Sequence, residues 1–150
     1  MSEALSEAIV QVVYHSDAIE RLRYIDGKSD WVDLRSAEEV QLKAGELRYI
    51  SLGVSVRLPE GYELWIAPRS STFKTYGILM PNSPGIVDES YSSDEDILRM
   101  PALALRDTVI HVNDRICQCR LMAHQPALRF EQVESLGHQE RGGFGSTGRQ

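Results

Sequence analysis

An arginine followed by three hydroxyl residues is the first group in this chain that could do chemistry. Arg69 precedes Ser70, Ser71 and Thr72, and Pro68 separates it from the apolar stretch 62–67. A guanidinium can bind phosphate oxygens through two parallel hydrogen bonds, and hydroxyl groups donate further bonds to such oxygens. The sequence therefore suggests a phosphate site here, with a surface turn and helix-capping serines as the plain alternative.

A second stretch, residues 82–91, places a carboxylate directly after an apolar Ile-Val pair. The carboxylate of Asp88 would lie at the mouth of a packed turn, where it could take a proton from water as a general base. The alternative is an aspartate that only starts a turn before Ser90. Tyr91 could likewise be an ordinary half-buried aromatic residue.

Asp33 is the candidate metal ligand, because carboxylates suit Mg²⁺ and often bind it through a retained water. A salt bridge with a nearby arginine is the simpler alternative. The four histidines are scattered without metal-ligand spacing, and Cys-x-Cys supplies only two of the four ligands of a structural zinc site. Cys117 and Cys119 are therefore expected to be reduced and packed. The motifs of covalent nucleophiles and of phosphate-binding loops are absent from the sequence.

The elements that would position these groups are short strands rich in β-branched and aromatic residues. The predicted strands are residues 9–14, 47–56, 62–67, 76–80, 102–112, 116–122 and 128–133. Turn-forming residues separate many of them. One short helix is predicted over residues 17–23. Many short strands at close spacing favour an all-β sandwich or jelly roll.

The C-terminal segment differs in composition from the rest. Residues 141–148 read Arg-Gly-Gly-Phe-Gly-Ser-Thr-Gly, half of them glycine. Taken alone, this composition favours a disordered terminus. The functional alternative is a mobile arm whose backbone N–H groups wrap an anion, because glycine permits the conformations of a phosphate nest.

Length and charge limit the class of protein. The chain has 150 residues, 42% of them hydrophobic and 25% charged, which suits one globular domain. A net charge of −6 without a basic stripe makes nucleic acid a poor partner. The N-terminus shows no secretory signal and no apolar stretch is long enough to cross a bilayer. We therefore expect a cytoplasmic protein that does not bind membranes.

Taken in order, these stretches resemble the five sequence motifs of the homotrimeric dUTPase family. The matching stretches are residues 33–37, 68–71, 82–91, 114–118 and 142–148. Each is modest alone, but five in order with family-like spacing make a strong match. The resemblance implies an all-β, jelly-roll-like barrel (a β-clip) over residues 1–136. It also implies a homotrimer in which a glycine-rich arm, residues 137–150, is exchanged between subunits and closes the active site.

The resemblance further implies Mg²⁺-dependent hydrolysis of dUTP to dUMP and pyrophosphate, by attack of water on the α-phosphorus. Such an enzyme lowers dUTP and supplies dUMP for dTMP synthesis. Asp88 would be the general base, and Asp33 would touch the metal ion only through water. Phosphoryl transfer needs chiefly positioning and electrostatics, so a covalent nucleophile is not required. The residues implied to hold the triphosphate are Arg69, Ser70, Ser71 and Gln118.

A β-hairpin over residues 80–91 would select the base and the sugar. Its implied substrate contacts are Asn82, Gly85, Ile86, Val87 and Tyr91. Cytosine would leave polar groups of the hairpin unpaired, and Tyr91 would leave no room for a 2′-hydroxyl. The arm would contribute Arg141, Phe144, Gly145, Ser146 and Thr147, with Phe144 stacked on the uracil.

Three departures from the family pattern point to a short bacterial or phage branch. Gln139 stands where the fifth motif usually has arginine, which leaves Arg141 as the substitute. Ser93 replaces a usual glycine, and Trp31-Val32 precedes Asp33 in place of the usual pair.

Three alternative functions follow from the same residues. One is dCTP deaminase, mono- or bifunctional, for which Glu89 is the sole candidate glutamate near the hairpin. Another is a non-catalytic trimer that binds dUTP or a protein partner as a regulator, against which the intact Asp88 argues. The third is an unrelated β-sandwich binding module, which leaves the order of the five motifs unexplained.

Overall fold

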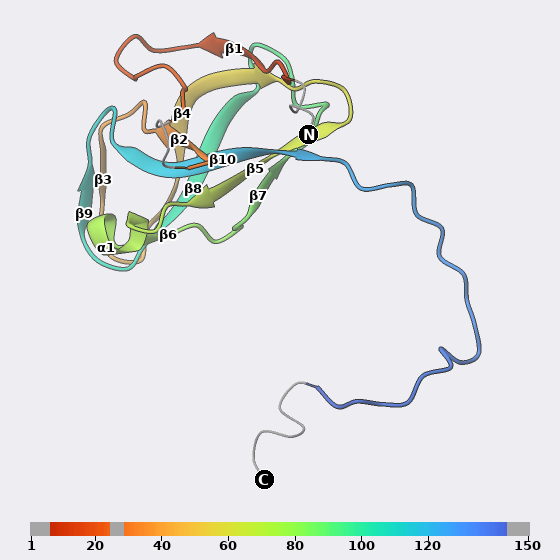
Figure 1. Ribbon diagram of the computed structural model, residues 1–150. Coiled ribbons are helices and arrows are strands. Elements are labelled where there is room, and N and C mark those ends of the chain that lie inside the picture. The colour runs from red at the N-terminus through yellow and green to blue at the C-terminus, as the bar shows by residue number, and fades with distance from the viewer. Residues whose placement is uncertain (1–6, 25–28, 144–150) are drawn as a thin grey trace.

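The computed structural model describes residues 7–24 and 29–143, in which ten strands and one short helix form (Figure 1). The strands are β1 (Gln11–Tyr14), β2 (Val32–Arg35), β3 (Val40–Leu42), β4 (Leu47–Arg57), β5 (Tyr62–Pro68), β6 (Ile78–Leu79), β7 (Gly85–Val87), β8 (Ile97–Ala104), β9 (Thr108–Ile110) and β10 (Arg115–Ala123). The helix is α1 (Thr72–Tyr76). The all-β prediction is confirmed.

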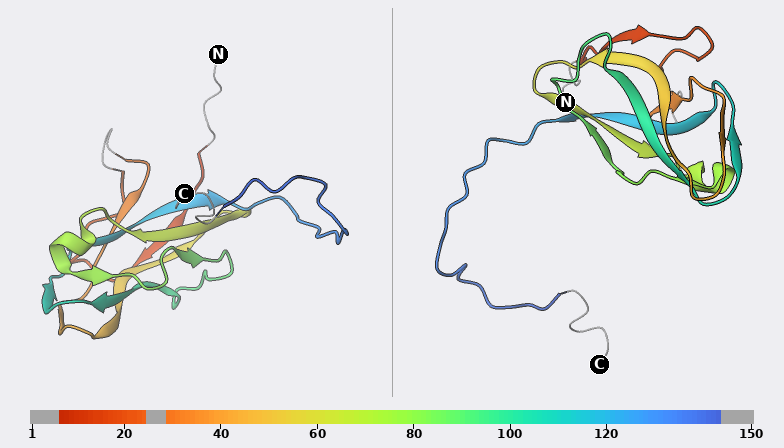
Figure 2. Two further views of the ribbon diagram at one scale, coloured as in Figure 1. Left: turned by 90° about the horizontal axis from the view of Figure 1, so that it is seen from below. Right: turned by 180° about the vertical axis from the view of Figure 1, so that it is seen from behind.

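Two four-stranded sheets pack face to face. One has the order β1-β4-β8-β6, the other β2-β10-β5-β7, and β3 pairs with β9 in a two-stranded ribbon (Figures 1 and 2). Every strand pair is antiparallel. Antiparallel strands in two layers give each sheet one face toward the core and one outer face.

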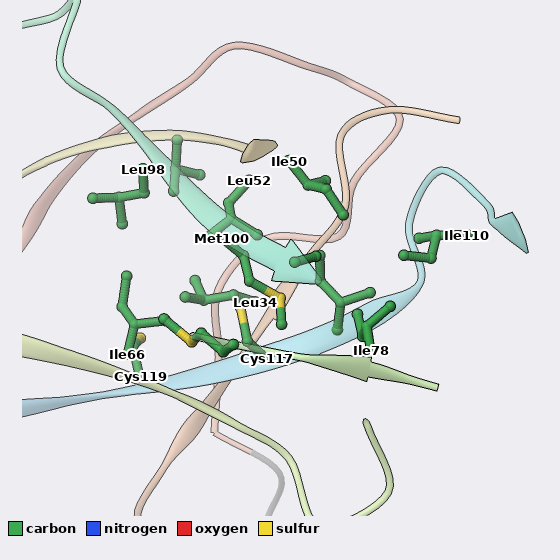
Figure 3. Packing of buried hydrophobic residues seen from close by; sticks show 14 of the residues in the cluster. Leu34, Ile50, Leu52, Ile66, Ile78, Leu98, Met100, Ile110, Cys117 and Cys119 are labelled. Atoms are coloured by element: carbon green, nitrogen blue, oxygen red, sulfur yellow. The ribbon is translucent and has the colours of Figure 1, made fainter. Parts of the chain in front are cut away.

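The core fills the space between the two sheets (Figure 3). Leu34 and Cys117 come from one sheet and Met100 from the other, and all three are fully buried. Burial raises the pKa of the Cys117 thiol well above its usual value and that of Cys119 to about 12. Both cysteines are free, so the prediction of reduced, packed thiols is confirmed.

The outer face of the sheet β2-β10-β5-β7 carries polar residues in register. Gln118 of β10 pairs with Asp33 on one side and with Ala67 on the other. Paired residues of antiparallel strands point to the same face. Because Cys117 and Cys119 on either side of Gln118 face the core, Gln118 and Asp33 lie together on the outer face.

The predicted helix over residues 17–23 does not form. The segment is held by long-range bonds instead: Leu22 N–H donates to the Tyr14 hydroxyl (2.9 Å), and Glu20 N–H donates to the Asn113 side chain (2.9 Å). A seven-residue segment has little helical stability of its own, so these contacts determine its path.

The one helix of the described residues, α1, was not predicted and overlaps the start of the predicted strand 76–80. Gly77, at φ 64°, closes the helix by donating its N–H to the Phe73 carbonyl at 2.7 Å. Glycine adopts this left-handed conformation without steric cost. The predicted strand 76–80 is therefore reduced to β6.

Strand boundaries differ from the prediction in three further places. The predicted strand 102–112 is broken into the end of β8 and β9, because residues 105–107 form a turn in which Arg106 donates to the Lys74 and Thr75 carbonyls of α1. The short strands β2, β3 and β7 were not among the predicted strands. The predicted strand 128–133 does not form within the single chain.

After Ala123 the chain leaves the sheets, and residues 124–143 extend away from the two-sheet body (Figures 1 and 2). Apolar side chains lie exposed along this segment, and Phe130 is 91% exposed. The domain boundary between residues 136 and 137 stays a prediction. In the described part of the chain, the structure contains no helix of the length and hydropathy needed to span a membrane.

Candidate active site

The stretch 82–91 forms one wall of a groove of about 490 Å³. β7 and the turns on either side of it supply this wall, and β4 and β8 supply the other. The lining includes Asn82, Gly85, Ile86, Val87, Asp88, Ser90 and Tyr91 together with Tyr49, Arg99 and Pro101. The structure thus brings together all six hairpin residues that the sequence predicts to act on the base, the sugar and the attacking water. We call this site the hairpin groove.

Gly85 is closely packed within the hairpin groove. A Cβ atom at this position would lie 2.9 Å from Met80 Cε and 3.4 Å from Asn82 Nδ2. Gly85 pairs with Ile66 at the edge of the sheet, where β7 joins β5. Any larger side chain at this buried position would therefore crowd Met80 and Asn82.

Asp88 carries a fully exposed carboxylate at the end of β7. Its Oδ2 accepts a hydrogen bond from the Ser90 hydroxyl and another from the Ser90 N–H at 3.0 Å. These two bonds lower the pKa of Asp88 below its usual value, the hydroxyl bond more strongly. Asp88 does start a turn before Ser90, and it remains ionised and open to solvent there.

The turn after Asp88 also positions Tyr91. The Tyr91 N–H donates to the Asp88 carbonyl at 3.0 Å, and its hydroxyl donates to the Ile97 carbonyl at 2.9 Å. These bonds tie the end of the hairpin to the start of β8, so that Tyr91 lies along the groove.

A second group of site residues lies on the outer face of β2, β10 and β5. Asp33 Oδ1 accepts from Arg69 Nε at 2.9 Å, and Asp33 Oδ2 accepts from Arg115 Nη1 at 3.3 Å. The Gln118 amide donates to the Pro68 carbonyl at 3.1 Å, and Arg69 Nη1 donates to Ser71 Oγ at 3.3 Å. We call Asp33, Arg69, Ser71, Arg115 and Gln118 the arginine cluster.

A buried threonine holds the chain under this cluster. Thr72 Oγ1 accepts from the Arg69 N–H at 2.8 Å and donates to the Ile116 carbonyl at 3.0 Å. Thr72 is almost fully buried at the start of α1. It therefore fixes the end of β5 against β10. Ser70 is exposed on the same turn.

The hairpin groove and the arginine cluster do not meet in one chain. Asp33, Arg69 and Gln118 do not line the hairpin groove. Of the predicted arm residues, Arg141 is exposed on the extended segment, and Phe144, Gly145, Ser146 and Thr147 lie outside the described residues. A larger hollow of about 640 Å³ beside α1, β3 and β9 contains none of the predicted site residues.

Sequence reasoning missed several residues that shape the site. The resemblance to the family motifs implies no role for Arg115, and the sequence indicates only a turn at Ser90. Tyr49 and Arg99 come from strands that no motif covers. The i to i+2 spacing of Asp88 and Ser90 could have indicated their hydrogen bond, whereas the other contacts depend on strand pairing.

Within residues 7–24 and 29–143, no three His, Cys, Asp or Glu side chains gather in a group that could hold a metal ion. Both carboxylate oxygens of Asp33 are already bonded to arginines. A divalent cation at this site would therefore need most of its oxygen ligands from a bound substrate, which is usual for Mg²⁺.

Comparison with known proteins places these features in a family. The dUTPase family profile matches residues 30–148. The chain is 46% identical over 139 residues to the SPbeta prophage-derived deoxyuridine 5′-triphosphate nucleotidohydrolase YosS of Bacillus subtilis, covering 93% of this chain and 97% of the relative. It is 35% identical over 145 residues to the deoxyuridine 5′-triphosphate nucleotidohydrolase of Neorickettsia sennetsu, covering 94% and 96%.

Solved structures show the same fold. A Staphylococcus bacteriophage 80alpha dUTPase mutant with dUpNHpp superposes with a TM-score of 0.74 at 20% identity, covering 93% of this chain and 98% of that one. A mutant dUTPase from phage phi11 of S. aureus, described with a structural Mg(II) ion, gives 0.72 at 18% identity, covering 85% and 98%. The expected jelly-roll-like fold is confirmed, and the chain belongs to the dUTPase family of enzymes, the dUTP diphosphatases.

Proposed function

We propose that this protein hydrolyses dUTP to dUMP and pyrophosphate in the cytoplasm, lowering dUTP and supplying dUMP for dTMP synthesis. The observation that carries the proposal is the convergence of Asn82, Gly85, Asp88 and Tyr91 on one groove. The groove joins an apolar wall to an exposed carboxylate, an arrangement that suits a nucleobase bound beside a group that activates water.

Asp88 is the general base of the proposed reaction. Its lowered pKa keeps the carboxylate ionised at neutral pH, so it can take a proton from water as the water oxygen attacks the α-phosphorus. The bond between the α-phosphorus and the bridging oxygen to the β-phosphorus breaks, and pyrophosphate leaves. Asp88 then releases the proton to solvent, to which it is open.

In this proposal, the backbone of β7 and the side chain of Asn82 select uracil. The backbone of residues 85–87, including Ile86 and Val87, and the Asn82 amide pair with the uracil edge. Cytosine has a donor where uracil has an acceptor, and the mismatch would leave buried polar groups unpaired. Tyr91 lies against the deoxyribose and excludes a 2′-hydroxyl.

The arginine cluster binds the phosphates in this proposal, together with Ser70. Arg69 and Gln118 hold the triphosphate, with Ser70 and Ser71 as hydroxyl donors. Mg²⁺ bound to the phosphate oxygens would neutralise negative charge. Asp33 would touch the ion through water, in keeping with its two arginine bonds.

One complete site requires more than one chain in this proposal. A homotrimer would bring the hairpin groove of one subunit to the arginine cluster of the next. The arm of a third subunit, with Arg141, Phe144, Gly145, Ser146 and Thr147, would close the site against bulk water. The exposed apolar side chains of Leu128 and Phe130 support a second chain as the cover for residues 124–143.

The test is pyrophosphate release from dUTP, dCTP, dTTP and UTP, each with and without Mg²⁺. We expect release from dUTP alone, strengthened by Mg²⁺. Ammonia release from dCTP would identify a deaminase instead. Binding of dUTP without turnover of any of the four nucleotides would identify a regulatory trimer.

A further inference from the structure

Four arginines surround a small cavity beside the arginine cluster. The cavity has a volume of about 120 Å³, and the side chains that line it are Glu20, Arg21, Arg23, Asp33, Arg35 and Arg115. They come from β2, from the start of β10 and from residues 17–23, the segment predicted to be helical. We call this cavity the four-arginine pocket.

The 17–23 segment is fixed in place by contacts with the body of the protein. Besides the bonds of Leu22 and Glu20 to Tyr14 and Asn113, the Arg21 guanidinium lies 4.0 Å from the centre of the Tyr14 ring. Arg35 is only 19% exposed and binds both Glu20 (3.0 Å) and the Asn113 carbonyl (2.8 Å). Several independent contacts thus hold the walls of the pocket.

The pocket carries more positive than negative charge. Outside the pocket, Asp33 is shared with Arg69, and the exposed Asp17 lies 3.9 Å from Arg21. The lining itself holds four guanidinium groups and the two carboxylates of Glu20 and Asp33. This excess of two positive charges stands in a chain whose net charge is −6. An anion in the pocket would offset the repulsion among the guanidinium groups, and arginine favours phosphate because its donors match phosphate oxygens in pairs.

The pocket adjoins the proposed triphosphate site. Arg115 lines the pocket, binds Asp33 with its guanidinium, and accepts a hydrogen bond from Arg69 Nη1 on its carbonyl at 3.4 Å. The arginine cluster and the pocket therefore share Asp33 and Arg115.

We propose that the four-arginine pocket binds a phosphate group, supplied by the outer end of a bound nucleoside triphosphate or by free inorganic pyrophosphate. If the phosphate comes from a nucleoside triphosphate, the proposal rests on the proposed function. If it comes from free pyrophosphate, the proposal stands independently of that function. Arg21 and Arg23 are then specificity residues for the number of phosphates, because a monophosphate bound at the hairpin groove would not extend to them.

The experiment measures binding by calorimetry with a non-hydrolysable dUTP analogue, with dUMP and with pyrophosphate. The variants are the double substitution Arg21→Gln/Arg23→Gln and the single Arg23→Gln. The Arg23 side chain is 68% exposed and lies 3.7 Å from Glu20 in an ion pair. Arg48→Gln is the matched control, because Arg48 is a surface arginine with one carboxylate partner, Glu38, outside the pocket.

We expect the double variant to lose about tenfold in affinity for the analogue and for pyrophosphate, with dUMP binding unchanged. The single variant changes an exposed side chain, which should disturb the fold little, and it should show a smaller loss of the same pattern. A loss for pyrophosphate alone would assign the pocket to the free anion.

Unchanged binding of both the analogue and pyrophosphate would overturn the proposal, as would an equal loss for all three ligands. Turnover of dUTP by the unaltered protein is measured separately. Failure of the pocket and failure of the proposed function are therefore distinguishable.

Discussion

The hairpin groove and the arginine cluster are built in opposite ways. One wall of the groove comes from a single stretch, residues 82–91, with residues of β4 and β8 opposite and Ile66 of β5 beside β7. The cluster joins Asp33, Arg69, Arg115 and Gln118, which lie far apart in the sequence and meet through strand pairing and ion pairs. Recognition of a flat base depends on shape and a few backbone groups, whereas binding of phosphates depends on convergent positive charge.

The same contrast separates the two aspartates. Both Asp33 oxygens accept bonds from arginines, and only 15% of the side chain is exposed. Asp88 is fully exposed, with serine hydrogen bonds and no ion pair among the described residues. Because both Asp33 oxygens are occupied by arginine bonds while the Asp88 carboxylate is open to a water molecule, we favour Asp88 over Asp33 as the base of the proposed reaction.

The largest effect should come from Asp88→Asn, which removes the base and keeps the shape of the groove. We expect kcat to fall by about a thousandfold, within the usual range for loss of a general base, with dUTP binding retained. Steady-state kinetics and calorimetry measure the two quantities. Asp94→Asn, on the neighbouring exposed loop, is the control, and normal turnover by the Asp88 variant would reject the assignment.

Arg69→Ala should lower kcat/KM for dUTP by about a hundredfold, because one charged donor to the phosphates is lost. Arg48→Ala is the matched control.

The proposed trimer can be tested by mixing equal amounts of Arg69→Ala and Asp88→Asn chains. If groove and cluster come from neighbouring subunits of such a trimer, activity should return at about a quarter of the sites. No recovery in the mixture would place both within one chain.

Gly85→Ala should raise the KM for dUTP by about tenfold with little change in kcat, because the added methyl group crowds the base site. Its Cβ would lie 2.9 Å from Met80 Cε. Adding Met80→Leu, which removes that Cε atom, should restore part of the affinity. Without any such restoration, crowding by Met80 would not be the cause.

The smallest effect should come from Ser90→Ala. The Ser90 hydroxyl is the largest cause of the lowered pKa of Asp88, so its loss raises that pKa. Because the base acts only when ionised, the acidic limb of the kcat/KM profile should move to higher pH, by less than about one unit. Ser92→Ala, in the exposed loop that follows, should leave the limb in place. A shift to lower pH would contradict the role given to Ser90.

Elements with strong local signals could be predicted from the sequence. The cores of β1, β4, β5 and β10 match the predicted strands, because alternation of apolar and polar residues is a local property. The predictions failed where a distant contact outweighed local preference. Residues 17–23 follow Tyr14 and Asn113 rather than helical propensity, and Arg106 breaks a long apolar stretch by binding α1.

By itself the sequence determined which residues could act and in what order they occur, including Asp88 within the continuous stretch 82–91. Only the tertiary structure decided that Asp33 is bound by Arg69 and Arg115, that Thr72 braces the end of β5, and that groove and cluster are separate in one chain. The physical reason is that residue type and spacing act over a few positions. The partners of a charged side chain depend on which strands pair, and that pairing follows from the burial of the whole core.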